Sequence, residues 1–438
     1  MDGSGNLNSG TDCSVRRTGC AVVTDARLRT AVTVIRSLGR GGIRVSAAEA
    51  RGLNRALGFQ SRYARERVYL GENAHKTPDL QDLDMLLEAC GPGGVIIPVH
   101  SPFVFMLSRK SHELRGRANF LVPDEAGLRL AHDKRDCFHL ALSLGIPVPG
   151  TWVPREHGRE PSSPDFEPWL ASLELAYPVI LKYRSGEDLW LSAAARTVKC
   201  STLQETAEKY REMDALQPDP VIQEYIEGTD WGAALLYDGD SRLIASFTYR
   251  SIRERPPGRG PTVYAESVYK PELIEMSHRL LSSLEWKGMA MLDFRQGTDG
   301  TFRLLEVNPR FWGSLALAVQ AGVDFPVLYY RAALGKWPGH GKQEDSQPVG
   351  TPICTPVCTE LYTHGLPRQK SGVRIRFFPQ DLLSVVDYAR KDGRPVLRAI
   401  TNEIREVIEH PSKDGLMDLT DPMPGLAYLL GGILSTRD

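Results

Sequence analysis

The segment GMAMLDFRQGTDGTFRLLEVNPR, residues 288–310, decides how the chain is interpreted. Two apolar-rich runs, Met289 to Phe294 and Phe302 to Asn308, flank the pair Asp299-Gly300. Asp-Gly is a favoured pair for a two-residue type I′ turn between antiparallel strands. The segment therefore predicts a β-hairpin with Asp299-Gly300 as its loop.

This register places Asp293 directly opposite Glu306, and strand alternation puts Asn308 on the same face as Glu306. Opposed carboxylates repel, so a cation should lie between them. Two acids and one amide offer oxygen ligands, which suit Mg²⁺, with Mn²⁺ as an alternative. An exposed face with solvated acids is the competing interpretation, but the flanking residues are strongly apolar, which favours a metal site in a cleft. Arg310 can reach the same side and neutralise developing negative charge.

The bulk composition describes an ordinary globular protein. The 438 residues allow about three domains. A net charge of -1 gives no electrostatic reason to expect nucleic acid or an acidic membrane as a partner. No apolar run approaches the roughly 18 residues of a transmembrane helix, and the start of the chain does not resemble a signal peptide. The seven cysteines are unevenly spaced and form no disulfide framework, so we expect a cytoplasmic protein.

Apolar patterning divides the chain into four parts. Residues 1–18 are predicted to form a disordered tail, and residues 19–120 a small α/β domain. In that domain a strand at Cys20 to Thr24, a helix at 28–38 and a strand from Ile43 form a βαβ unit, which implies a parallel sheet. Residues 121–338 alternate strands and helices. Residues 339–438 have no assigned role.

Four local features stand out in the region 121–338. Asp133 is a predicted N-cap of a helix that ends at Gly145. Val179 to Lys182 and Val221 to Glu224 are predicted strands. Residues 251–262 are predicted to form a long basic loop containing Arg253, Arg255 and Arg259, and loops of that length are often functional.

The hairpin residues resemble the magnesium signature of the ATP-grasp superfamily, which includes D-alanine–D-alanine ligases and biotin carboxylases. The phrase LEVNPRFWGS, residues 305–314, is especially similar to a carboxylate–amine ligase branch. The resemblance covers about residues 20–335. It implies an α/β (α+β) fold: a Rossmann-like pre-ATP-grasp domain at 19–120, a two-lobed ATP-grasp domain at 121–338, and a C-terminal extension at 339–438.

The same resemblance implies roles for further residues. Lys182 and Lys134 resemble lysines that contact the phosphates of ATP. The run Gln223-Glu224-Tyr225-Ile226 resembles the hinge that lines adenine, where backbone groups of Glu224 and Ile226 would read the base edge. Asp230 lies where the superfamily places an acid on the ribose hydroxyls. A lysine in a first helical turn opposes the helix dipole, which favours a ligand role for Lys134.

The chain also departs from its relatives at two places. The loop Tyr183 to Asp188 contains one glycine, Gly186, where relatives are glycine-rich. Either Arg184 and Ser185 help to bind phosphate, or the loop closes weakly. Met291 replaces an arginine of D-alanine–D-alanine ligases, and we assign the lost catalytic role to Arg250 or Arg253, beside Arg310.

The implied activity is an ATP- and Mg²⁺-dependent ligation of a carboxylate to an amine. It passes through an acyl-phosphate and releases ADP and phosphate. The alternatives are an ATP-binding module without ligase activity and a carboxylase with the same ATP site. The implied partners are small carboxylate and amine substrates that resemble amino acids, with no nucleic acid or membrane partner, and a homodimer is left open.

Overall fold

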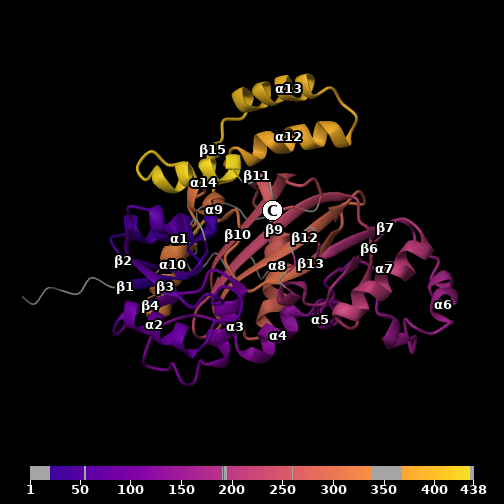
Figure 1. The fold of residues 1–438 in the computed structure, drawn as a ribbon, viewed down its shortest axis with the longest axis horizontal. Coiled ribbons are helices and arrows are strands. Elements are labelled where there is room, and N and C mark those ends of the chain that lie inside the picture. The colour runs from indigo at the N-terminus through magenta and orange to yellow at the C-terminus, as the bar shows by residue number, and fades with distance from the viewer. Residues whose placement is uncertain are drawn as a thin grey trace, which may run out of the picture.

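The computed structural model describes residues 20–53, 56–189, 191, 195–258, 260–336 and 367–434. The predicted tail at residues 1–18 and the predicted boundary at 338/339 lie outside these ranges. Helices and three sheets make up the described chain, so the predicted α/β class is confirmed (Figure 1). None of the described helices has the length and apolar character needed to span a bilayer.

The N-terminal domain is built on a parallel sheet with strand order β3-β2-β1-β4. The predicted βαβ unit is present as β1, α1 and β2, with Gly42 at φ +75° after the helix. Ala21, Val22 and Val23 of β1 are fully buried, which explains why the sequence predicts a strand here. The elements are β1 (Cys20–Val23), α1 (Arg29–Arg40), β2 (Arg44–Ala50), η1 (Leu57–Gln60), β3 (Ala64–Leu70), α2 (Leu80–Cys90), β4 (Val95–Ile97) and α3 (Ser101–Arg109).

A small lobe follows, with an antiparallel sheet of order β5-β8-β6-β7. The predicted strands at 179–182 and 221–224 are β6 and β8, and Asp133 caps α5 as expected by accepting from the backbone of Arg135 and Asp136. The elements are α4 (Glu125–His132), α5 (Lys134–Ser143), β5 (Thr151–Trp152), η2 (Pro154–His157), α6 (Phe166–Ser172), β6 (Val179–Lys182), η3 (Gly186–Leu189), β7 (Thr197–Cys200), α7 (Leu203–Leu216) and β8 (Val221–Glu224).

The largest sheet has the order β13-β12-β9-β10-β11-β14-β15. Alternate residues of β9 enter two different cores: Ala234 and Leu236 pack with α1, α9 and α10, whereas Ala233 and Leu235 pack with α4, α5 and α8. The sheet is therefore covered on both faces, one of them by the N-terminal domain. Its elements, with the helices between them, are β9 (Gly228–Tyr237), β10 (Leu243–Glu254), β11 (Thr262–Ser267), α8 (Pro271–Ser282), β12 (Gly288–Gly297), β13 (Phe302–Asn308), α9 (Leu315–Gln320) and α10 (Phe325–Ala333).

The prediction of a long loop at residues 251–262 is wrong. Strand β10 continues to Glu254 and β11 begins at Thr262, so the connection is shorter than expected. The pairing of β10 with β11 is irregular on either side of Arg253, which hides the simple alternation that identifies a strand. Arg259 lies outside the described residues.

The C-terminal extension completes the largest sheet. Strand β14 adds antiparallel to β11, and β15 adds parallel to β14, while α12 and α13 form a helical pair at the end of the molecule (Figure 1). This part of the chain had no sequence assignment. Its elements are β14 (Arg374–Arg376), α12 (Gln380–Lys391), α13 (Val396–Glu409), β15 (Lys413–Asp414) and α14 (Met423–Leu434).

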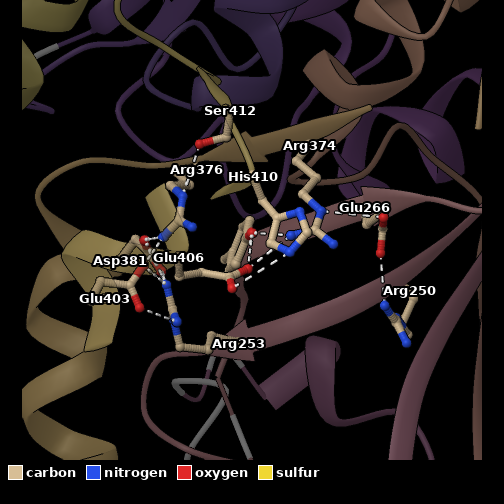
Figure 2. Close-up of polar contacts among 11 residues, drawn as sticks. Arg250, Arg253, Glu266, Arg374, Arg376, Asp381, Glu403, Glu406, His410 and Ser412 are labelled. Atoms are coloured by element: carbon tan, nitrogen blue, oxygen red, sulfur yellow. Dashed lines mark hydrogen bonds and ion pairs between the residues drawn. The ribbon is translucent and has the colours of Figure 1, made fainter. Parts of the chain in front are cut away.

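Ion pairs fasten the helical pair to the sheet (Figure 2). Arg253 of β10 binds Asp381 of α12 with Nε–Oδ1 at 2.9 Å, and Glu403 of α13 with Nη1–Oε2 at 2.7 Å. Arg376 of β14 binds the same two acids and lies 3.7 Å from the centroid of the Tyr264 ring. Because these side chains are largely buried, each charge depends on its partners.

Removal of the Asp381 charge should therefore destabilise the extension. Asp381→Asn would leave two buried guanidinium groups with Glu403 alone, and we expect a loss of about 3 kcal/mol in the free energy of unfolding, measured by urea denaturation. Asp240→Asn is the matched control, because Asp240 pairs with Arg242 at the exposed surface and should cost less than about 1 kcal/mol. Equal effects of the two substitutions would contradict this account.

Candidate active site

The hairpin of β12 and β13 contains the predicted pair, although not the predicted turn. Asp293 lies directly opposite Glu306. Near the turn, however, the Gly297 amide donates to the Thr301 carbonyl at 3.0 Å, which leaves a three-residue loop with Gly300 at φ +79°. A bulge at Leu305, between the Asp293 and Phe294 pairs, shifts the register back by one residue. The bulge therefore restores the opposition that the longer loop would have removed.

Asn308 lies between the two carboxylates. Its Nδ2 donates to Asp293 Oδ2 at 3.0 Å and to Glu306 Oε1 at 3.2 Å, while Arg310 Nη2 donates to its Oδ1 at 3.1 Å. Burial, then the neighbouring Glu306 and Asp230, raise the pKa of Asp293 well above its usual value. Two converging carboxylates and an amide that can turn its oxygen toward them form an oxygen-donor set that fits a Mg²⁺ ion.

Cations from other elements surround this triad. Lys134, the first residue of α5, places Nζ 3.3 Å from Glu306 Oε2, and Arg310 is bound to Asn308. Lys182, at the end of β6, faces the same cleft. The cleft has a volume of about 490 Å³ and is lined by residues of the N-terminal domain, the small lobe and the largest sheet. The arrangement therefore offers positive charge around a site with two acids.

Lys182 has an unusual proton affinity. Burial, with the positive charge of Lys134, lowers the pKa of Lys182 to about 8, and Glu306 and Asp230 oppose this shift only in part. A lysine with this pKa gives up its proton under mildly alkaline conditions. An anionic ligand in the cleft would raise the pKa again, because it favours the charged form.

The Asp230 carboxylate forms an ion pair with Arg295. Arg295 binds it through two contacts, Nε–Oδ1 at 2.5 Å and Nη2–Oδ2 at 2.7 Å. Burial and a hydrogen bond with Asp230 raise the pKa of Glu254 well above its usual value. Asp230 lines the cleft, but its oxygens are shared with Arg295 and Glu254, and its predicted ribose contact stays a prediction.

The predicted hinge residues lie beside the cleft rather than in its lining. Gln223 is buried in β8, and the Glu224 amide donates to the Gly150 carbonyl at 2.7 Å. The Ile226 carbonyl accepts from Arg295 at 3.2 Å, and Lys199 lies 4.1 Å from the centroid of the Tyr225 ring. The Glu224 amide is therefore already paired within the protein, and the predicted adenine contact of the other backbone groups stays a prediction.

The structure does not bring Arg250 or Arg253 to the cleft. Arg250 pairs with Glu266 at 2.7 Å, and Arg253 is held by the two acids of the extension (Figure 2). Neighbouring residues of a strand point to opposite faces, and it is Glu254, not Arg253, that lines the cleft. Both arginines are therefore paired with acids of the sheet and its extension, and their predicted catalytic role stays a prediction that this geometry does not support.

Arg184 is likewise committed to a protein contact. Its Nε donates to Asp133 Oδ2 at 2.9 Å, while the Ser185 amide donates to Gln217. The first contact ties the loop after β6 to the start of α5, and the second ties it to the end of α7.

Arg295, Glu254 and Arg29 are among the cleft residues that the sequence does not predict. Alternation from Asp293 on β12 could have found Arg295, since residues two apart share a face. Glu254 falls in the segment predicted as a loop, where strand alternation cannot tell which face a side chain points to. Arg29 begins α1 in another domain, so no local spacing relates it to the hairpin.

Comparisons with known proteins agree with this fold. Residues 217–352 match the family described as ATP-grasp in the biosynthetic pathway with Ter operon. The chain is 28% identical over 281 residues to a D-alanine–D-alanine ligase of Pseudomonas entomophila, covering 55% of this chain and 81% of that relative.

Solved structures show the same architecture at low identity. Biotin carboxylase from Campylobacter jejuni aligns with TM-score 0.56 and 13% identity over 72% of this chain and 71% of its own. N5-carboxyaminoimidazole synthetase from Staphylococcus aureus aligns with TM-score 0.55 and 13% identity, over 73% and 78% of the two chains.

The lowered pKa of Lys182 predicts a pH-dependent affinity for a triphosphate. As pH rises through about 8, the free protein loses a proton that the bound anion would require, so the affinity for Mg-ATP should fall by up to about tenfold per pH unit. Calorimetry between pH 7 and 9 in buffers of different ionisation enthalpy would show proton uptake. Lys182→Arg keeps its charge and should flatten the profile. An identical slope in both proteins would contradict the assignment.

The opposed acids are expected to lower thermal stability in the absence of metal and to be required for stabilisation by Mg²⁺. The raised pKa of Asp293 means that its ionised form costs stability at neutral pH, so the neutral variant Asp293→Asn should melt about 2 °C higher without divalent cations. Excess Mg²⁺ should stabilise the wild type and not the variant, as measured by thermal unfolding. A variant that still responds to Mg²⁺ like the wild type would argue against this site.

Proposed function

We propose that this chain, which belongs to the ATP-grasp superfamily, is an ATP-dependent ligase that joins a carboxylate to an amine through an acyl-phosphate. The carrying observation is the pair Asp293 and Glu306, opposed in a cleft and bridged by Asn308. Cationic side chains of Lys134, Lys182 and Arg310 reach the same cleft. The sequence similarity to a D-alanine–D-alanine ligase supports amide formation.

The residues have separate roles in this proposal. Asp293, Glu306 and Asn308 would hold Mg²⁺ or Mn²⁺, which when bound supplies charge neutralisation for the triphosphate. Lys134 and Lys182 bind phosphate oxygens. The contact between Lys134 and Glu306 at 3.3 Å keeps this lysine at the cleft until an anion takes its charge.

The reaction has two steps. A carboxylate oxygen of the first substrate attacks the γ-phosphorus of ATP, the bond to the bridging oxygen breaks, and ADP leaves with an acyl-phosphate in place. The amine nitrogen of the second substrate then attacks the acyl carbon. Phosphate leaves with the bonding electron pair and takes up the proton that the amine gives off. Arg310 stabilises the negative charge that develops on the acyl oxygen.

A carboxylase is the second candidate, and the structural likeness to biotin carboxylase favours it. The two functions differ in their reactants. A carboxylase would release ADP with bicarbonate as the carboxylate, whereas the proposed ligase requires an organic acid and an amine. The sequence similarity to an amide-forming relative is the reason to prefer the ligase.

The proposed activity predicts ADP release with pairs of amino acids. A coupled assay for ADP, combined with mass spectrometry of the product, should find at least one pair that yields an amide of the summed mass less water. Glu306→Gln should lower the rate at least about 100-fold, because the cation site loses one charge. Glu272→Gln, an exposed acid in the first turn of α8, should keep full activity.

Two results would contradict the ligase. One is ADP release that depends on bicarbonate and gives no amide, which would identify the carboxylase. The other is tight Mg-ATP binding without ADP release for any acid and amine, which would identify an ATP-binding module.

A further inference from the structure

Arg29 is a cation of the cleft without an acidic partner in the described part of the chain. Its Nη2 donates to the Thr262 carbonyl at 2.9 Å, and its guanidinium carbon lies 3.8 Å from the centroid of the Phe377 ring. Both contacts orient the group and neither neutralises its charge. Burial accordingly lowers the pKa of Arg29. Arg29 forms no ion pair within the described residues, and Asp414 acts on it only at longer range. A fixed guanidinium of this kind that lines a cleft is suited to an anionic ligand.

The position of Arg29 in its helix is unfavourable for structure alone. It is the first residue of α1, which has no side-chain cap and no acid in its first turn. The amino end of a helix carries partial positive charge, so a cation placed there is disfavoured and an anion is favoured. The partial positive charge at the amino end of α1 and the charge of the Arg29 guanidinium therefore both favour binding of an anion at this position.

The fold places this helix end where open α/β sheets bind ligands. In the strand order β3-β2-β1-β4, the chain reverses direction across the sheet at β1, and α1 follows the carboxyl end of β1. Crevices at such a switch point are the usual ligand sites of these sheets. Here the amino end of α1 lies at the cleft, since Arg29 lines it and Thr30 donates to the Trp312 carbonyl at 3.3 Å.

The facing wall carries one buried polar atom without a protein partner, Trp312 Nε1, and beside it the buried Ser314 hydroxyl, which interacts with Tyr249. Both residues line the cleft. Gly313 lies between them, and a Cβ built on it would come within 3.0 Å of Arg29 Nη2. The glycine thus leaves room for the guanidinium, and Trp312 and Ser314 supply donors beside it. Buried donors without partners are costly unless a ligand pairs with them.

We propose that Arg29, Trp312 and Ser314 form a carboxylate subsite. Its ligand is the carboxylate of an amino acid that donates the amine, a group that stays free in the product. This inference rests on the proposed ligase function and names the class of its second substrate. The reacting acid and the triphosphate belong with Lys134, Lys182 and Arg310, and Arg29 contacts none of the metal-site residues.

The subsite can be tested by binding, without turnover. Thermal unfolding of the wild type with Mg-ADP is measured with each of the twenty amino acids and with the corresponding amino-acid amides. At least one amino acid should raise the melting temperature while its amide, which lacks the charge, should not. Arg29→Gln should abolish that shift, and Arg44→Gln, an exposed arginine of the same domain, should retain it. If no amino acid gives an Arg29-dependent shift, the subsite is overturned.

Steady-state kinetics separate this role from a role in nucleotide binding. Arg29→Gln should raise KM for the amine-donating amino acid about 10- to 100-fold, with Arg29→Lys intermediate and the dissociation constant of Mg-ATP unchanged. Gly313→Ala should raise the same KM, because its Cβ displaces Arg29 without removing charge. A change in Mg-ATP affinity of similar size would assign Arg29 to the nucleotide and overturn the proposal.

The two proposals fail in different ways. Absence of ADP release with every acid and amine would remove the ligase, while the binding experiment would still show whether Arg29 discriminates a carboxylate from its amide. Amide formation with full use of amino-acid amides by the wild type would keep the ligase and remove the subsite.

Discussion

Repulsion between Asp293 and Glu306 is the constraint around which the cleft is organised. The two carboxylates are directly opposed, and burial together with Glu306 raises the pKa of Asp293. Such a pair is stable only where positive charge is supplied. The protein supplies it from separate elements, Lys134 at the start of α5 and Lys182 at the end of β6. Lys182 therefore joins the small-lobe sheet electrostatically to the largest sheet, whose apolar core is a separate cluster, whereas α5 packs directly on the largest sheet.

The sequence predicts the two opposed acids of this site but not the backbone geometry that opposes them. Asp293 and Glu306 face each other as expected, although the turn and the register differ from those that the residue spacing predicts. The loop is one residue longer than the Asp-Gly pair implied, and the bulge at Leu305 compensates. Loop length and bulge position depend on the partner strand and the packing beneath it, so neither is written in local residue preference. The strands β6 and β8 were found because their patterning is local.

Contacts between distant segments were beyond reach of the sequence. Arg253 looked like a loop cation because its partners, Asp381 and Glu403, lie more than a hundred residues away in a region with no recognised pattern. Strand β14 has three residues and joins the sheet at β11 by long-range pairing. Arg29 and the Trp312 wall meet only because the N-terminal domain covers one face of that sheet. In each case tertiary pairing, not propensity, decides the role of the residue.

The extension and the cleft are physically continuous through one short stretch of chain. Phe377 follows β14 directly, and its ring lies against Arg29, while Arg376 on the same strand is fixed by Asp381 and Glu403. The Phe377 amide also bonds to the Val263 carbonyl at 2.9 Å, next to Thr262, whose carbonyl holds Arg29. The ion pairs that fasten the helical pair thus fix the strand whose next residue orients Arg29. The C-terminal extension, for which the sequence predicts no function, therefore forms part of the wall that holds Arg29 in place. Within the described residues no contact joins Arg29 to Asp293 or Glu306, so the carboxylate subsite and the metal site are separate sets of side chains.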